Sequence, residues 1–131
     1  MSLDKLNNCI KIKGANNSRA REAIYKILME SKVCLNVSQI SKQLSNIYPK
    51  KISQNTLYRH LNFFMECQLV VVIQDDYKRA YYHLRDTDLM IFSICPHCNS
   101  VGKIDSNELR SCDTLKDAEF ITLHKICNKC K

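Results

Sequence analysis

The chain has 131 residues and a formal net charge of +7, with 20 lysines and arginines against 13 aspartates and glutamates. No stretch approaches the ~20 apolar residues that cross a bilayer, and residues 1–10 contain no apolar signal-peptide core, so we expect a cytoplasmic protein without membrane contact. The chain has only two glycines, which excludes a glycine-rich phosphate loop. It also has no nucleophile motif, and both observations argue against an enzyme.

Positive charge is concentrated in the first part of the chain. Residues 1–85 carry 14 basic against 6 acidic side chains, whereas residues 86–131 carry 6 against 7. This division predicts two domains, of which the first binds a polyanion. The lysines of residues 1–17 are compatible with a basic arm or with an unstructured lead-in, and no pattern there distinguishes the two.

Three amphipathic helices are predicted in the first domain, over residues 18–30, 37–47 and 53–67. Apolar side chains recur in them at intervals of three and four, and Ser18 and Ser53 stand where N-caps are expected. Pro49 ends the second helix, because a residue that precedes proline avoids helical dihedrals. The third helix is expected to bury Leu57, Leu61 and Phe64.

A β-hairpin is predicted next, from the β-branched strand 69–74 and the strand 80–84, joined by the polar turn 75–79. Three helices followed by a hairpin indicate a winged helix-turn-helix domain, residues 1–85. The exposed face of its third helix lacks Glu and Lys, which ordinary solvated faces favour, and carries instead side chains that can read base edges or grip phosphate. We therefore predict contacts to double-stranded DNA from Gln54, Asn55, Thr56, Tyr58, Arg59 and Asn62, and from Lys78 and Arg79 at the wing tip.

The second domain, residues 86–131, is predicted as a small α/β unit with strands 89–94, 101–104 and 119–126 and a helix over residues 106–117. The chain as a whole is thus of the α+β class. A short sheet with open edges favours pairing with an identical copy, so we expect a homodimer that binds a pseudo-palindromic DNA site. A monomeric zinc ribbon is the alternative.

Two Cys-x-x-Cys pairs lie within this second domain. Their spacing lets two tight turns aim four sulfurs at one ion about 2.3 Å away, which predicts one structural Zn²⁺ per chain bound by Cys95, Cys98, Cys127 and Cys130. Two alternatives to a zinc site remain. Some of these cysteines could be small buried apolar side chains, or the pairs could be redox dithiols that make the chain a thiol oxidoreductase or a redox switch. The single cysteines Cys9, Cys34, Cys67 and Cys112 are expected to be reduced thiols.

These segments together resemble the ferric uptake regulator family of bacterial metal- and peroxide-responsive repressors, over nearly the whole chain. Residues 18–21 with Ile24 resemble the opening helix of that family, residues 53–61 its recognition helix, residues 82–84 the end of its wing, and the cysteine pairs its structural zinc site. The resemblance implies a dimeric repressor in which Arg21, Tyr58 and Arg59 contact DNA. Arg19, in the same opening segment, is also predicted to contact DNA.

The chain departs from that family where a regulatory metal is expected. The histidine-rich run that normally precedes the first cysteine pair is replaced by residues 89–92, whose aliphatic and aromatic side chains are poor metal ligands. Asn36 stands where the family has a histidine, and His83 where it commonly has a glutamate. A residual site could use His83, Asp86, Asp88 and His124.

The leading hypothesis is a zinc-stabilised, sequence-specific DNA-binding regulator whose affinity is not switched by a second metal. Oxidation of Cys67 or Cys112 is an alternative signal that could control DNA binding, although buried, inert thiols are the simpler interpretation of both residues. A winged helix that binds protein rather than DNA is a third possibility, and its binding would not fall steeply with salt.

Overall fold

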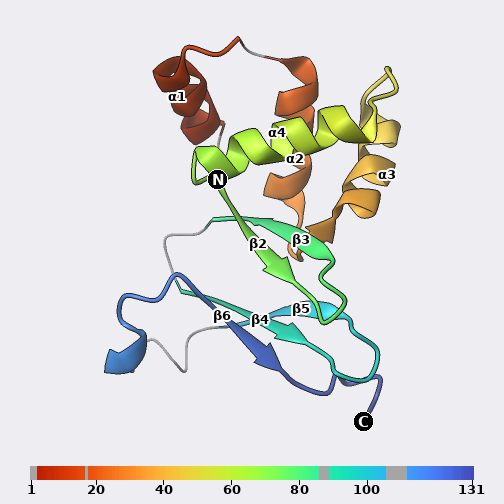
Figure 1. The fold of residues 1–131 in the computed structure, drawn as a ribbon, viewed down its shortest axis with the longest axis vertical. Coiled ribbons are helices and arrows are strands. Elements are labelled where there is room, and N and C mark those ends of the chain that lie inside the picture. The colour runs from red at the N-terminus through yellow and green to blue at the C-terminus, as the bar shows by residue number, and fades with distance from the viewer. Residues whose placement is uncertain (1–2, 17, 86–88, 106–111) are drawn as a thin grey trace.

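The computed structural model describes residues 3–16, 18–85, 89–105 and 112–131. Its elements form three layers, with four helices above a first sheet and a second sheet below (Figure 1). In chain order they are α1 (Asp4–Lys13), α2 (Arg19–Glu30), β1 (Leu35–Asn36), α3 (Val37–Ile47), α4 (Gln54–Glu66), β2 (Val70–Gln74), β3 (Ala80–Leu84), β4 (Met90–Ile94), β5 (Val101–Ile104), the 3₁₀ helix η2 (Asp113–Leu115) and β6 (Phe120–His124). None of the helices in these ranges has the length and apolar character needed to cross a bilayer.

The three predicted helices are confirmed as α2, α3 and α4, and local signals explain where each begins. The side chains of Ser18 and Ser53 accept hydrogen bonds from backbone N–H groups in the first turns of α2 and α4. Asn36 forms a reciprocal capping box with Gln39 at the start of α3. The inner faces of the helices, with Leu57, Leu61 and Phe64 among them, are buried in the first hydrophobic core.

Residues 4–13, where no sequence pattern favoured one structure over another, form α1. Leu6 and Ile10, one turn apart, are buried in the same core as the other helices. Gly14 ends the helix in a left-handed conformation with φ 64°. α1 thereby lies against the C-terminal end of α4, where a disulfide joins Cys9 to Cys67. The expectation that these two cysteines are reduced thiols is therefore wrong, because the long-range packing that brings them together leaves no local signal.

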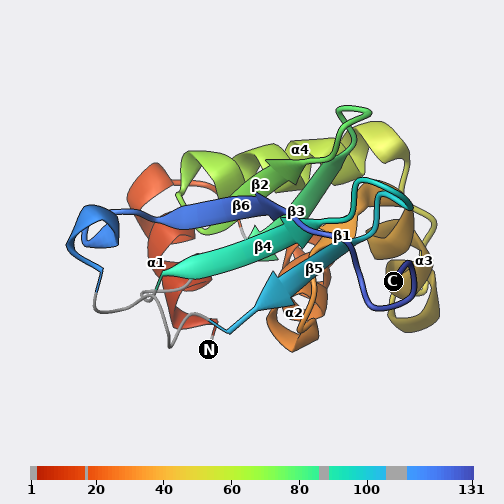
Figure 2. The same ribbon diagram turned by 90° about the horizontal axis from the view of Figure 1, so that it is seen from below.

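The predicted hairpin is confirmed as β2 and β3, which pair antiparallel with Val72 opposite Tyr82. A two-residue strand, β1, adds to β3 to give the order β1-β3-β2. The second sheet has the order β5-β4-β6, in which β4 and β6 run parallel. It lies across the first sheet (Figure 2). A second core fills the space between them, formed by Cys34, Val71, Ile73, Tyr81, Met90, Phe92 and Ile94.

The helix predicted over residues 106–117 is not continuous. Residues 106–111 lie outside the described part, and Asp113–Leu115 form only a 3₁₀ helix preceded by an extended Cys112. The turn bonds here are of the i to i+3 type, from Leu115 to Cys112 and from Ala118 to Leu115. None of residues 112–118 is buried, so no packed face stabilises a longer α-helix.

Candidate metal centre and nucleic-acid interface

The two Cys-x-x-Cys turns meet because β4 and β6 are parallel neighbours. Each turn follows the C-terminal end of its strand, where Ile94 pairs with His124. The first turn is closed by a 2.8 Å hydrogen bond from the Asn99 N–H to the Cys95 carbonyl, and the second by a 3.1 Å bond from Cys130 to Cys127. Asn99 takes the left-handed conformation, with φ 63°.

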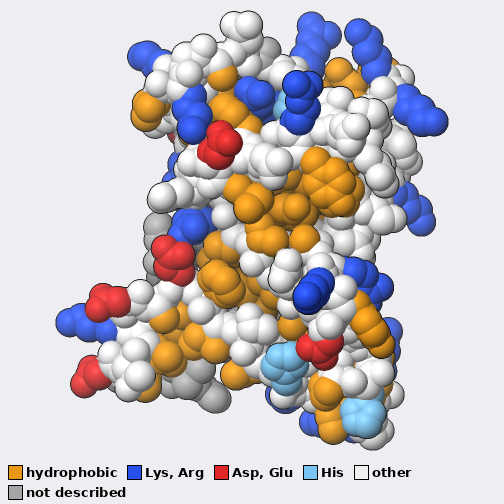
Figure 3. Space-filling view, viewed as in Figure 1, with side chains coloured by type: hydrophobic (Ala, Val, Ile, Leu, Met, Phe, Trp, Pro, Cys, Tyr) orange, Lys and Arg blue, Asp and Glu red, His pale blue; other side chains and the backbone are white. Residues whose placement is uncertain are grey.

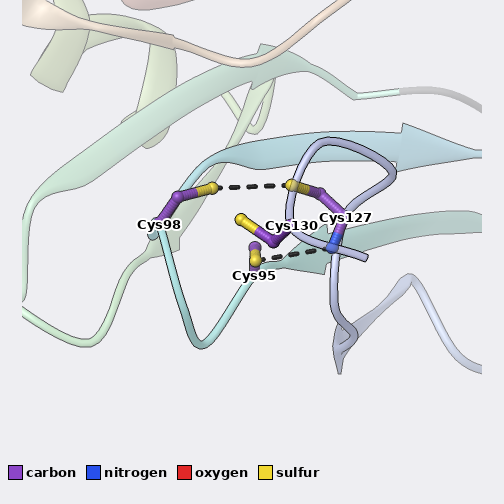
Figure 4. Close-up of side chains that lie close together, drawn as sticks. All are labelled: Cys95, Cys98, Cys127 and Cys130. Atoms are coloured by element: carbon purple, nitrogen blue, oxygen red, sulfur yellow. Dashed lines mark hydrogen bonds between the residues drawn. The ribbon is translucent and has the colours of Figure 1, made fainter.

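The four sulfurs of Cys95, Cys98, Cys127 and Cys130 all lie within 4.8 Å of one another (Figure 4). A tetrahedral zinc ion with bonds of about 2.3 Å places its sulfur ligands about 3.8 Å apart. The Sγ atoms of Cys98 and Cys127 are 3.6 Å apart, and the Cys127 N–H donates to the Cys95 Sγ at 3.4 Å. Donor set and spacing therefore fit a structural Zn²⁺, which would be held by all four cysteines.

The surroundings of the sulfurs favour thiolates at two of the four positions. Backbone N–H groups of Cys127 and Cys98 lower the pKa of Cys95 to about 6. Hydrogen bonds with Ser100 lower the pKa of Cys98. Hydrogen bonds with the sulfurs of Cys127 and Cys98 instead raise the pKa of Cys130 to about 12. A proton is thus retained among sulfurs that are close enough to share one cation, and metal binding would release it.

Of the four residues considered for a second metal, the structure describes His83 and His124. His83 is buried, with its Nδ1 atom 2.7 Å from the Leu84 carbonyl and its ring 5.7 Å from that of Phe92. His124 is half exposed, and its Nδ1 lies 3.8 Å from a carboxylate oxygen of Asp76. Asp86 and Asp88 fall outside the described residues. Among those that are described, the four cysteines are the only group of three or more potential His, Cys, Asp or Glu ligands close enough to hold one ion.

The predicted base-reading face of α4 is exposed opposite its buried leucines. Tyr58 retains 44% of its accessible surface, and only Thr56 is half-buried. Lysine and arginine side chains project from this helical half of the molecule, as the upper part of Figure 3 shows. The other exposed members of the face are Gln54, Asn55, Arg59 and Asn62. These polar side chains are thus exposed on a helix whose opposite face is packed in the core.

Arg21, predicted to contact DNA, lies between α2 and α4 in the structure. Its guanidinium lies 3.9 Å from the centre of the Phe63 ring, and its Nη1 donates to the Asn16 carbonyl at 3.1 Å. Its Nε donates to Nδ1 of His60 at 3.3 Å. Arg21 is therefore half-buried and links α2 to α4 through His60 and Phe63. Arg19 is exposed.

The contact between Arg21 and His60 predicts a pH-dependent stability. Burial, and then the charges of Arg21 on α2 and Arg59 on α4, lower the pKa of His60 from 6.5. Below pH 6.5 the unfolded chain therefore binds more protons than the folded chain. The stabilisation from neutral His60 is complete above that pH and is lost as the pH falls toward the lowered value. Protonation also removes the acceptor for the Arg21 N–H.

Urea unfolding from about pH 7.5 to about pH 5 measures this effect, with His60→Gln as the comparison because glutamine accepts a hydrogen bond without titrating in this range. We expect the free energy of unfolding to fall more steeply with acidification in the native protein than in the variant. Parallel pH profiles for the two proteins would contradict the assignment.

The wing is organised by a carboxylate that the sequence analysis did not single out. The buried side chain of Asp75 accepts 2.9 Å hydrogen bonds from the backbone N–H groups of Tyr77 and Arg79 and a 2.7 Å bond from the Arg79 Nε. Burial alone would raise the pKa of Asp75, but these bonds lower it overall. Exposed Lys78, with φ 64°, stands at the tip, next to Tyr77, whose side chain is also exposed. An aspartate that opens a polar turn between strands is the signal that could have identified this role.

The sequence matches the profile of the ferric uptake regulator family over residues 12–126. The ferric uptake regulation proteins of two Helicobacter pylori strains are 25% and 26% identical over 109 and 107 residues, which span 83% and 82% of this chain and 72% and 71% of theirs.

Solved structures share the fold of this chain. The Helicobacter pylori regulator, described as having three functional metal binding sites, superimposes with a TM-score of 0.80 at 23% identity, covering 98% of this chain and 90% of its own. The ferric uptake regulator of Vibrio cholerae superimposes with a TM-score of 0.72 at 18% identity, covering 92% of this chain and 98% of its own. The chain belongs to the ferric uptake regulator family, whose members are metal-responsive regulators of transcription and not enzymes.

Proposed function

We propose that this protein is a sequence-specific DNA-binding repressor of transcription that reads double-stranded DNA with α4. The observation that carries the proposal is the exposed face of that helix, where Asn55, Arg59 and Asn62 stand opposite side chains buried in the core. Arginine pairs with guanine and asparagine with adenine through two hydrogen bonds each. Lys78 at the wing tip supplies a phosphate contact, and the domain of residues 1–85 carries the excess positive charge.

The proposed regulator acts as a homodimer formed by the domain of residues 86–131. β6 is an edge strand of its sheet in the described structure, and Phe120, Leu123 and Ile126 each retain more than a third of their surface. Pairing with a second copy would cover this edge and its apolar side chains. Two copies of α4 would then meet half-sites of a pseudo-palindrome about 34–36 Å apart.

One structural Zn²⁺ per chain would hold the dimerisation domain, and no second metal would switch DNA binding. The described residues supply one cluster of ligands, and residues 90–92 are core side chains rather than ligands. The alternative, a redox function of the cysteine pairs, is less well supported. All four sulfurs converge on one point, whereas a catalytic dithiol uses a separate pair at a helix N-terminus.

Substitution of the proposed reading face tests DNA binding directly. A duplex obtained by selection from random sequences would serve as the operator in fluorescence anisotropy. We expect Arg59→Ala to weaken binding by roughly 10-fold to 100-fold, equivalent to ~1–3 kcal/mol, and to relax specificity at one base position. Lys78→Ala should weaken binding to all duplexes and lower the slope of log affinity against log salt by about 1.

Lys116→Ala is the matched control, because Lys116 is equally exposed but lies beside η2, away from α4 and the wing. It should leave affinity unchanged. Binding that is insensitive to salt, or equal losses for Lys78→Ala and Lys116→Ala, would contradict the proposed surface and favour a protein partner.

A further inference from the structure

A covalent bond between distant parts of the chain is not used by the proposed DNA and zinc sites. Cys9 on α1 and Cys67 at the C-terminal end of α4 form a disulfide, although 58 residues separate them. Their Cα atoms are 6.1 Å apart, within the usual range for a disulfide. Cys67 also caps α4, because its N–H donates to the Phe63 carbonyl. The bond thus fastens α1 to the end of the helix that presents the candidate reading face.

The bond lies at the surface, within reach of small molecules. A cavity of about 490 Å³ opens over both sulfur-bearing residues, and its wall includes Lys5, Ile12 and Gln68. Cys9 and Cys67 are themselves half-buried. Cys34 differs, because it is buried between the two sheets and burial raises the pKa of its thiol to about 12. Accessible paired sulfurs react with oxidants and reductants, whereas an enclosed protonated thiol does not.

Few other contacts described here hold α1 to the end of α4. Leu6 and Ile10 anchor the inner face of α1 in the core, and Lys13 makes a 3.6 Å ion pair with Glu66. Both partners of that ion pair are substantially exposed, so it contributes little. Ile12 is 85% exposed. Beyond Leu6 and Ile10, the disulfide is therefore the strongest described link between α1 and the end of α4.

We propose that Cys9 and Cys67 are a peroxide-oxidised dithiol that reversibly fastens α1 to α4. One thiolate attacks hydrogen peroxide to give a sulfenic acid and hydroxide, and the second thiol then displaces water from that sulfur to form the disulfide. Two thiols and one peroxide thus give one disulfide and two waters. A dithiol reductant reverses the reaction by exchange and is itself oxidised to a disulfide. Transcription regulators work where thiols are kept reduced, and disulfides formed there are usually transient and redox-sensing.

The test uses the full-length, zinc-loaded protein, first reduced and then titrated with hydrogen peroxide. Peptide mapping by mass spectrometry follows the cross-link, a thiol reagent counts free cysteines, and a chromogenic chelator reports zinc release. We expect two thiols per chain to be lost as a Cys9–Cys67 cross-link before zinc is released. Tryptic cleavage after Lys11 and Lys13 should slow several-fold on oxidation.

Cys9→Ser and Cys67→Ser should abolish both the early thiol loss and the protection of α1, whereas Cys112→Ser, at an exposed thiol, should retain them. If a serine variant fails to fold, the test rests on the peptide map of the native protein, which shows whether Cys9 and Cys67 become cross-linked before zinc is released. Thiol loss that always accompanies zinc release, or a cross-link of Cys9 to any other cysteine, would overturn the proposal. None of these measurements involves DNA. The redox proposal can therefore fail or succeed independently of the proposal that α4 binds DNA.

Discussion

Replacing Cys98 with serine is expected to remove zinc from the chain and to unfold the second sheet. In the native chain the four cysteine sulfurs lie within 4.8 Å of one another and can form a closed tetrahedral shell of thiolates. Three sulfurs and a serine hydroxyl cannot form that shell. Binding of a structural zinc contributes ~10–16 kcal/mol in small zinc domains, and most of that is folding free energy. β5 and β6 contain no fully buried residue, so this sheet depends on the ion more than the helical part does.

Zinc content by elemental analysis and urea unfolding followed by circular dichroism measure the effect. The helical part has its own core and should keep its α-helical signal. Cys112→Ser is the matched control, since Cys112 is an exposed cysteine of the same region outside the cluster. Retention of one zinc per chain and an unchanged unfolding curve in Cys98→Ser would show that the cluster is not the metal site.

Replacing Phe92 with alanine is expected to cost ~3–5 kcal/mol of the free energy of unfolding. The side chain has no exposed surface and lies in the core between the two sheets, with its ring 5.7 Å from His83 and 6.2 Å from Phe120. Its loss leaves a cavity that rigid strands on both sides cannot close. Because a domain of this size is stable by only ~5–15 kcal/mol, the variant should unfold at much lower urea concentration.

Phe120→Ala provides the comparison within the same aromatic cluster. Phe120 keeps 37% of its surface exposed, so its truncation should cost clearly less. If both variants lose the same free energy of unfolding, the interface between the sheets does not contribute as described. A change in the slope of the unfolding curve for Phe92→Ala alone would indicate that the two sheets have begun to unfold separately.

Local signals in the sequence were sufficient for the helices and the hairpin. Ser18 and Ser53 cap where expected, and the spacing of Leu57, Leu61 and Phe64 identifies the buried face of α4. These features depend on residues within a turn or two of one another. The metal cluster was also predictable, because the Cys-x-x-Cys spacing restricts each pair to a tight turn.

Features that depend on contacts between distant segments could not be predicted in the same way. α1 has only Leu6 and Ile10 as buried anchors, and its pairing through Cys9 spans 58 residues. The stacking of the two sheets leaves no signal within either half of the chain. That stacking explains why Met90 and Phe92 are apolar here, since both lie in the core between the sheets and are at most 2% exposed. Within the range of the predicted helix, residues 113–115 form a 3₁₀ helix, because none of the described residues 112–118 is buried.

Native mass spectrometry of the protein bound to its selected DNA duplex tests the central claim most directly. The account predicts two chains per duplex, one zinc ion per chain and no other metal, with DNA binding retained after a mild chelator has removed loosely held ions. A second metal that is required for the complex, or a complex of full affinity that contains no zinc, would contradict it.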